Sequence, residues 1–383
     1  MRKNLLLVSL LSGAILFTSF LHAQIDRFAY AVTDVEISGS NWNYLRKLNF
    51  QTGEYSNVLL NGNDASLLAY DAGSKKQFTS LLNDAHWGTK INAAFSTGVA
   101  AMAYDKNNNR LYYTPMFIDQ LRYVDLKTMK VYFVTDQTLT GMPEKSPDQG
   151  NVVTRMVIAS DGNGYAMTND ATHFIQFNIG RKSNITDLGT LVDDPANKNT
   201  SVHNSCSSYG GDMVADDNGN LYIFSARNNV FKVNIANRVA THLGVITGLP
   251  SGFTTNAAAV NDKNQILVGS ALQTFSYFMV DPKTLAATAY NIKGQVWHSS
   301  DMANSNVLKS GNKPVDIIQE ILTSAVTNTG DNRIQIYPNP VINNKFIVQF
   351  KQLDPGNYTI QLLDVSGRQV QQKLINISGE NQT

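Results

Sequence analysis

The stretch DMVADDNGNLYIFSARNNVFKVNIANRVATHLGVI, residues 212–246, contains four short runs of alternating apolar residues separated by turn residues. The first turn is Asp-Asn-Gly, and the second run passes through Leu221 and Tyr222. Such runs, bounded by Asn, Asp and Gly, are typical of antiparallel strands joined by tight turns. Four strands of this length make one blade of a β-propeller, so the stretch predicts an all-β protein built from blades.

The same pattern recurs at four other places, which are residues 28–60, 99–135, 153–191 and 257–291. The first copy lacks the opening strand that the others have. A detached fragment, SSDMAN at residues 299–304, matches the opening GGDMVAD of the copy at 212–246. We therefore predict that this fragment pairs with the strand at residues 28–33 and closes the ring, because closure leaves no long unpaired edge.

The number of blades follows from an Asp or Asn at the end of each third strand. These residues are Asn49, Asp125, Asn178, Asn234 and Asp281, at spacings of 76, 53, 56 and 47 residues. The first spacing is too long for one blade and too short for two ordinary ones. Two readings follow, namely five blades with an insertion, or a sixth, irregular blade between Gly62 and Ser96.

The N-terminus predicts export. Residues 1–23 have a basic start, an apolar run shorter than a spanning helix, and Ala23 before Gln24, which is the pattern of a secretory signal peptide. No other run approaches spanning length. The formal net charge of the chain is +1, which gives no bulk attraction for a nucleic acid or an anionic membrane.

The last part of the chain, residues 332–383, changes character. It opens on the motif YPNP, continues with the alternating runs FIVQF and YTIQLLD, and has turns at Gly-Asn-Tyr and Asp-Val-Ser-Gly-Arg. This part resembles the type A C-terminal sorting domain of the type IX secretion system of Bacteroidetes. The residues that carry the resemblance are Tyr337, Pro338, Asn339, Pro340, Gly356, Tyr358, Asp364, Gly367 and Arg368.

The resemblance implies a small Ig-like antiparallel β-sandwich that addresses the protein to the type IX secretion machinery. The protein is then secreted or attached to the outer-membrane surface. Members of the family normally continue with another strand pair, so the domain is expected to be incomplete at Thr383. The predicted order is a signal peptide at 1–23, a propeller at 24–306, a linker at 307–331 with a short helix or extended segment at 315–322, and the sorting domain at 332–383.

No motif for a metalloprotease, an α/β-hydrolase, a P-loop or a dinucleotide site is present, and no cofactor or metal is expected. The Asp-Asn-Gly turns do not have the spacing of a calcium loop. The repeats resemble extracellular and periplasmic propellers of the NHL and lactonase-like types in strand and turn pattern alone, so no catalytic residue is carried over.

Insertions of unequal length separate the last strand of one blade from the first strand of the next, at residues 61–97, 136–150, 192–209, 247–255 and 292–298. In a propeller these connections emerge on one face, and variation confined to one face is how a repeat protein builds a binding surface. The aromatic and imidazole side chains there are the predicted ligand-binding residues: His86, Trp87, His203, Tyr209, Trp297 and His298.

The function hypothesis is a propeller that binds an extracellular polymer or protein through this face. The alternative is a propeller enzyme, a lactonase, lyase or glycan hydrolase, with a metal or a carboxylate pair at the mouth of the channel.

Overall fold

The computed structural model describes residues 25–64, 67–79, 93–141, 148–180, 182–290, 293–309, 334–342, 345–350, 355–363 and 369–378. The chain divides into two compact units, Met1–Gly311 and Asn312–Thr383. Each unit is described by itself. The predicted signal peptide and the segment at 315–322 lie outside the described residues. Within the described part, no helix is long and apolar enough to cross a membrane.

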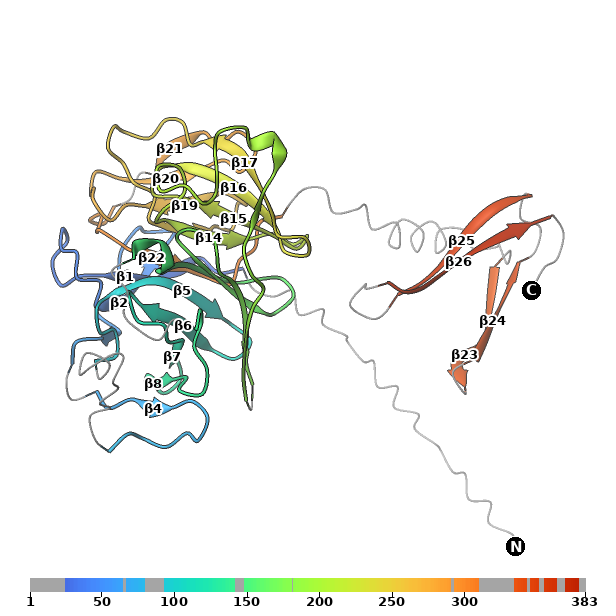
Figure 1. The fold of residues 1–383 in the computed structure, drawn as a ribbon, viewed down its shortest axis with the longest axis horizontal. Coiled ribbons are helices and arrows are strands. Elements are labelled where there is room, and N and C mark those ends of the chain that lie inside the picture. The colour runs from blue at the N-terminus through green and yellow to red at the C-terminus, as the bar shows by residue number, and fades with distance from the viewer. Residues whose placement is uncertain are drawn as a thin grey trace, which may run out of the picture. The chain divides into compact units, whose positions relative to one another are not determined.

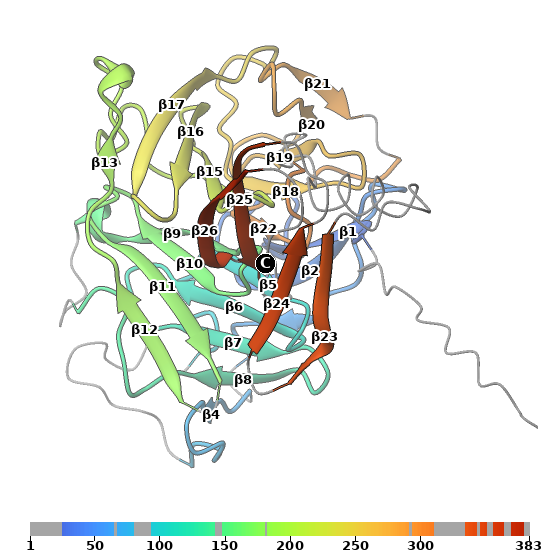
Figure 2. The same cartoon turned by 90° about the vertical axis from the view of Figure 1, so that its right-hand side faces the viewer.

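The first unit is a ring of five β-sheets, each one a propeller blade (Figures 1 and 2). Blade 1 runs from the axis outward as β22 (Asp301–Ala303), β1 (Phe28–Thr33), β2 (Tyr44–Asn49) and β3 (Leu60–Asn61). Blade 2 runs as β5 (Val99–Asp105), β6 (Arg110–Pro115), β7 (Arg122–Asp125), β8 (Lys130–Phe133) and β4 (Tyr70–Asp71). Blade 3 consists of β9 (Val153–Ile158), β10 (Gly164–Thr168), β11 (Phe174–Ile179) and β12 (Ser183–Asp187).

Blade 4 runs as β14 (Asp212–Ala215), β15 (Asn220–Phe224), β16 (Asn229–Asn234), β17 (Val239–Val245) and β13 (Val192–Asp193). Blade 5 consists of β18 (Ala257–Val260), β19 (Ile266–Gly269), β20 (Tyr277–Val280) and β21 (Ala287–Tyr290). Two short 3-10 helices, η2 (Gln149–Asn151) and η3 (Pro195–Asn197), lie in the loops. The inner strands β22, β5, β9, β14 and β18 contact one another in that cyclic order, so the ring is closed.

Five blades with an insertion is therefore the correct reading, and the sixth blade is not formed. In the described part of residues 62–96 the one strand is β4, which adds to the outer edge of blade 2. It pairs in parallel with β8 through Tyr70 and Asp71. The long first spacing thus reflects an extra edge strand and its loops.

The predicted ring closure is confirmed. β22, from the end of the propeller sequence, pairs antiparallel with β1, which matches Tyr30 to Ala303 and Val32 to Asp301. Next to this pairing, Asn306 accepts a hydrogen bond from the Asp26 N–H at 2.8 Å and donates one to the Asp26 carbonyl, also at 2.8 Å. Blade 1 is thus assembled from both ends of the propeller sequence.

The core consists of the interfaces between blades. On β5, Met102 points to the interface with blade 1, whereas Ala101 and Ala103 point to the interface with blade 3. β14 alternates in the same way, because Met213 faces blade 3 and Val214 faces blade 5. An inner strand of a propeller is covered on both sides, which explains why these strands read as continuous apolar runs.

In four of the five blades, the Asp or Asn that marks the third strand forms a turn, and the exception is Asn178 of blade 3. Asn49, Asp125, Asn234 and Asp281 each accept hydrogen bonds from the backbone N–H groups two and three residues later, at 2.8–3.3 Å. The residue four positions on has a positive φ in every case: Gly53, Met129, Arg238 and Leu285. The side chain therefore specifies the hairpin from the third strand of the blade into the strand that follows it.

The propeller's packing extends to Lys309. Leu308 is buried against blade 4, its N–H donates to the Ala215 carbonyl at 2.8 Å, and its carbonyl accepts from the Asp217 N–H at 3.0 Å. The first residues of the segment predicted as a linker are thus part of the ring.

The described part of the second unit consists of two antiparallel hairpins. β23 (Ile334–Ile342) pairs with β24 (Lys345–Phe350), and β25 (Gly356–Leu363) pairs with β26 (Gln369–Ile377). The YPNP motif lies in β23, where the register shifts between Tyr337 and Ile342. Proline has no N–H to donate to a ladder, which accounts for the irregularity. Asp364, Gly367 and Arg368 lie outside the described residues.

We predict that a chain ending after His298 does not fold, whereas one ending after Leu322 melts like the full chain. The first loses β22, which exposes the edge of β1 and opens the ring, and the second keeps every described contact of the propeller. Thermal unfolding monitored by circular dichroism tests both. A large drop in the melting temperature of the longer chain would show that the propeller depends on the sorting domain.

Candidate functional site

The loops predicted as insertions lead into the first residues of β5, β9, β14, β18 and β22, so they share one face, called here the insertion face. Of the predicted binding residues, His203 and Tyr209 precede β14, and Trp297 and His298 precede β22. His86 and Trp87 lie outside the described residues.

Tyr209 is part of a polar cluster on the insertion face. A methyl group placed on Gly150 would lie 3.0 Å from Asp148 Oδ1, 3.0 Å from the Tyr209 hydroxyl and 3.2 Å from Asp170 Oδ2. Three oxygen atoms thus lie close together around Gly150, which is buried and leaves little room for a side chain. Asp148 is exposed, and Asp170 and Tyr209 are half-buried. We call Asp148, Asp170 and Tyr209 the oxygen cluster.

Local turns hold the two carboxylates of this cluster. Asp148 caps η2, and its Oδ1 accepts from the Gly150 N–H at 2.8 Å. Asp170 Oδ1 accepts from the Thr172 N–H at 3.1 Å and from the Thr168 and Thr172 hydroxyls at 2.7 and 2.8 Å. Each carboxylate is therefore oriented by its own chain segment before any ligand arrives.

A buried arginine lies beneath the cluster. Arg155 is fully buried, and its Nη2 donates to the Gly210 carbonyl at 3.0 Å and to the Ser208 hydroxyl at 3.2 Å. Burial lowers the pKa of Arg155 to about 10, and Asp170 and Asp212 oppose this. Burial also raises the pKa of Tyr209, an effect that Asp170 and Asp148 strengthen. The arginine thus ties the chain around Tyr209 to blade 3.

His203 joins this group through the backbone. Its ring Nδ1 lies 2.6 Å from the Asp170 carbonyl oxygen, so this nitrogen carries the proton and donates. The structure therefore brings two of the predicted residues, His203 and Tyr209, to one place.

Trp297 and His298 form a second group, where the loop from β21 crosses between blades 5 and 1. The Arg46 guanidinium lies 4.3 Å from the Trp297 ring centroid, and the Tyr55 ring lies 6.0 Å away. The His298 N–H donates to the Ile37 carbonyl at 2.9 Å. Trp297 is half-buried by these contacts, which join the two blades.

The site that sequence reasoning missed lies on the propeller axis. Asp212 and Asp301 occupy the first positions of β14 and β22, and both are fully buried. Asp212 Oδ2 accepts from the Ala258 N–H at 2.6 Å and from the Met302 N–H at 3.3 Å. One carboxyl group therefore bonds to the inner strands of blades 5 and 1 while it belongs to blade 4.

Asp301 has no such donors. No N–H or hydroxyl group of the described residues has hydrogen-bond geometry toward either of its carboxyl oxygens. Burial raises the pKa of Asp301 well above its ordinary value, and the neighbouring Asp212 raises it further, while the nearby Met102 N–H opposes this in part. Burial also raises the pKa of Asp212, to about 8. Both pKa values are thus raised, which favours the protonated form of at least one of the two carboxyl groups at neutral pH.

The sequence feature that could have revealed this pair is the Asp-Met dipeptide that GGDMVAD and SSDMAN share. The pair does not have the accessibility of a catalytic dyad, since both side chains are closed off from solvent. Among the described residues, no three His, Cys, Asp or Glu side chains are placed to hold a metal ion.

Comparison with known proteins identifies the second unit. Residues 335–383 match the secretion system C-terminal sorting domain. No curated protein matches the chain. Among solved structures it is similar to a streptogramin B lyase, at 10% identity over 66% of this chain and 63% of that one, with a TM-score of 0.34.

Two further likenesses have the same strength. Virginiamycin B lyase from Staphylococcus aureus is 10% identical over 73% of this chain and 75% of that one, with a TM-score of 0.36. A protein of unknown function from Bacteroides caccae is 10% identical over 69% and 73%, with a TM-score of 0.34. The chain thus spans less than two thirds of the streptogramin B lyase, and likenesses this weak say nothing about activity.

The fold defines a five-bladed β-propeller protein. At its C-terminus this propeller protein carries the sorting domain of the type IX secretion system. That system exports the protein to the cell surface or beyond.

The buried carboxyl pair leads to a pH prediction. The pKa values of Asp212 and Asp301 are raised on folding, so the folded state binds more protons than the unfolded state between about pH 4 and 8. The stabilisation that these extra protons give is fully present below about pH 4 and is lost as the pH rises through that window. The free energy of unfolding then falls by up to about 1.4 kcal/mol per pH unit for each extra proton. Asp301→Asn keeps a hydrogen-bond donor beside Asp212 and should flatten the dependence.

The measurement is the free energy of unfolding in urea from pH 5 to pH 8. The exposed Asp136→Asn serves as the control and should keep the wild-type slope. Parallel profiles for Asp301→Asn and the wild type would show that folding does not raise the pKa values of this pair.

Proposed function

We propose that this exported propeller binds an extracellular polymer or protein through its insertion face, at the oxygen cluster. The observation that carries the proposal is that oxygen atoms of Asp148, Asp170 and Tyr209 lie close together around the buried Gly150. Local turns orient the two carboxylates on the face where the blades carry their insertions.

The chemistry of the cluster suits a ligand rich in hydroxyl or amide groups. The two carboxylates accept hydrogen bonds, the Tyr209 hydroxyl donates or accepts, and the Tyr209 ring offers a flat apolar surface. A sugar ring or a peptide segment presents this combination of donors and apolar patches. His203, held against Asp170, adds an imidazole edge beside them.

The course of the chain supports the same face. β22 runs from the insertion face to the opposite face, and the described propeller ends beyond it at Lys309. The last described residues of the propeller thus lie on the face opposite the oxygen cluster.

One observation favours the alternative of a glycan hydrolase. Glycosidases place two carboxyl groups about 5–10 Å apart across the scissile bond, and Asp148 and Asp170 converge on one point. We rank binding first because neither carboxyl group is buried in the way that produces a general acid. Release of shortened products from a bound glycan, abolished by Asp148→Asn or Asp170→Asn, would replace binding with catalysis.

Once a glycan or protein array identifies a ligand, Tyr209→Ala should weaken binding by roughly thirtyfold, about 2 kcal/mol, because an aromatic contact at the centre of the site is lost. Isothermal titration calorimetry measures the affinity. Asn218→Ala, at an exposed turn on the opposite face, is the control and should bind normally. Equal affinity of both variants would place the ligand elsewhere.

Export by the sorting domain has its own test. A chain that lacks residues 332–383 should remain inside a type IX secreting host, whereas the full chain reaches the surface or the medium. Cell fractionation followed by immunoblotting compares the two. Surface exposure of the shortened chain would mean that the propeller itself carries an export signal.

A further inference from the structure

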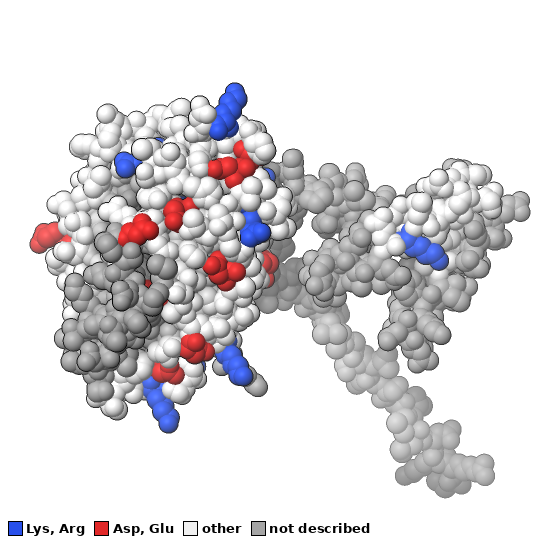
Figure 3. Space-filling view, in the orientation of Figure 1, with Lys and Arg blue, Asp and Glu red and all other residues white. Residues whose placement is uncertain are grey.

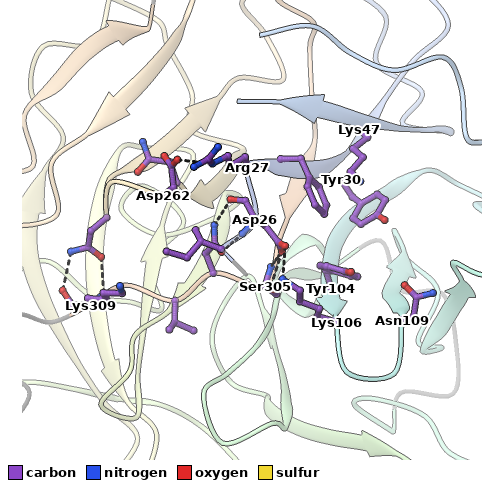
Figure 4. Close-up of a pocket in the computed structure, with 16 residues that line it drawn as sticks. Asp26, Arg27, Tyr30, Lys47, Tyr104, Lys106, Asn109, Asp262, Ser305 and Lys309 are labelled. Atoms are coloured by element: carbon purple, nitrogen blue, oxygen red, sulfur yellow. Dashed lines mark hydrogen bonds and ion pairs between the residues drawn. The ribbon is translucent and has the colours of Figure 1, made fainter. Parts of the chain in front are cut away.

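A second candidate site lies on the face opposite the insertions. A cleft of 1180 Å³ opens there between blades 1, 2 and 5 (Figure 4). Its walls are the start of β1, the β5–β6 and β18–β19 hairpin turns, and the segment that follows β22. We call it the basal cleft. Its volume exceeds the roughly 300–1,000 Å³ of ordinary small-molecule pockets.

The carboxylates of the basal cleft are already used. Asp26 Oδ1 lies 2.8 Å from Lys106 Nζ, and Asp26 Oδ2 accepts from the Ser305 N–H at 2.9 Å and its hydroxyl at 2.6 Å. Asp262 pairs with Arg27 at 3.2 Å. Two lysines of the lining, Lys47 and Lys309, have no carboxylate partner among the described residues. The cleft therefore carries a positive excess.

Lys47 is held in place by aromatic rings. Its ammonium lies 3.5 Å from the centroid of Phe28 and 5.5 Å from that of Tyr30, and within the described part of the chain no oxygen accepts its protons. Burial lowers the pKa of Lys47, while Asp26 offsets part of this effect. Cation–π contact stabilises the charge but leaves its hydrogen-bond donors unused.

Two phenol groups lie beside this ammonium. Tyr30 and Tyr104 are 8% and 7% exposed, and their ring centroids are 5.1 Å apart. Neither hydroxyl has a hydrogen-bond partner among the residues that the structure describes. Burial raises the pKa of Tyr104 to about 12, and that of Tyr30 is raised for the same reason. Both phenols therefore stay protonated and remain donors. Figure 4 shows Tyr30, Lys47 and Tyr104 on the same side of the cleft.

We propose that the basal cleft binds an acidic oligosaccharide, with a carboxylate or sulfate group of the sugar held by Lys47, Tyr30 and Tyr104. The anion supplies the acceptor that these donors lack. The lining also includes the amide of Asn109, which is suited to sugar hydroxyls. An acidic peptide is the competing ligand, and the titration with poly-glutamate below tests it.

The test is calorimetric titration of the mature full-length protein with three oligosaccharides of equal length: oligogalacturonate, a heparin fragment and dextran. We expect binding of at least one acidic sugar and none of neutral dextran, and the preferred acid distinguishes carboxylate from sulfate. Poly-glutamate is titrated in parallel. Binding of dextran or poly-glutamate in place of the acidic sugars, or of none of the four, would overturn the proposal.

Substitutions in the basal cleft test whether the acidic sugar binds there. Lys47→Met keeps an unbranched apolar side chain over Phe28 but removes the charge. It should weaken binding by about tenfold to a hundredfold. Lys47→Arg should retain most of the affinity, and Tyr104→Phe should lose about threefold to tenfold. Lys127→Met removes an exposed charge from a turn outside the cleft and should bind normally. Equal losses in Lys47→Met and Lys127→Met would mean that bulk charge, not the cleft, attracts the sugar.

Tyr209→Ala separates this site from the insertion face, because it should leave binding of the acidic sugar unchanged. A loss in that variant would assign the acidic sugar to the oxygen cluster and overturn the basal cleft as its site.

Discussion

The pairing of β22 with β1 is the constraint on which the propeller depends. Only three residues of β22 take part, yet they complete blade 1 and provide the inner strand between blades 5 and 2. Without them the ring has two open edges, and unpaired edges expose backbone groups that must otherwise find partners. Asp212 supports the closure from blade 4, because its carboxylate accepts the Met302 N–H of β22.

The closure also separates the two faces. Because β22 is the last inner strand, the chain leaves the ring opposite the insertions, and Ile25 and Lys309 both line the basal cleft there. The insertion loops and the oxygen cluster lie on one face. The two ends of the propeller sequence lie on the other face, together with the lysines and tyrosines of the basal cleft. On the face shown in Figure 3 the charges of both signs are interspersed, so recognition rests on local groups and not on a large field.

The two faces differ in the kind of group that is left without a partner. On the insertion face, acceptors converge, and each of the two carboxylates is oriented by a turn of its own segment. In the basal cleft the carboxylates are neutralised and donors remain. A ligand with hydroxyl groups suits the first arrangement, and an anion suits the second. The two proposed sites therefore call for ligands of different chemistry on one scaffold.

The sequence by itself determined the blades, the ring closure and the sorting domain, because each of them is marked by patterns of a few neighbouring residues. Alternation, Asx turns such as that of Asp125, and the copied Asp-Met dipeptide act over a few residues and are visible in one chain. Only the tertiary structure decided which polar groups meet. Asp212 and Asp301 are 89 positions apart, and Asp26 meets Ser305 across 279. Tyr209 was identified from its loop, but its neighbours Asp148 and Asp170 come from another blade. Such contacts depend on how strands distant in sequence pack around one axis, and no local pattern encodes them.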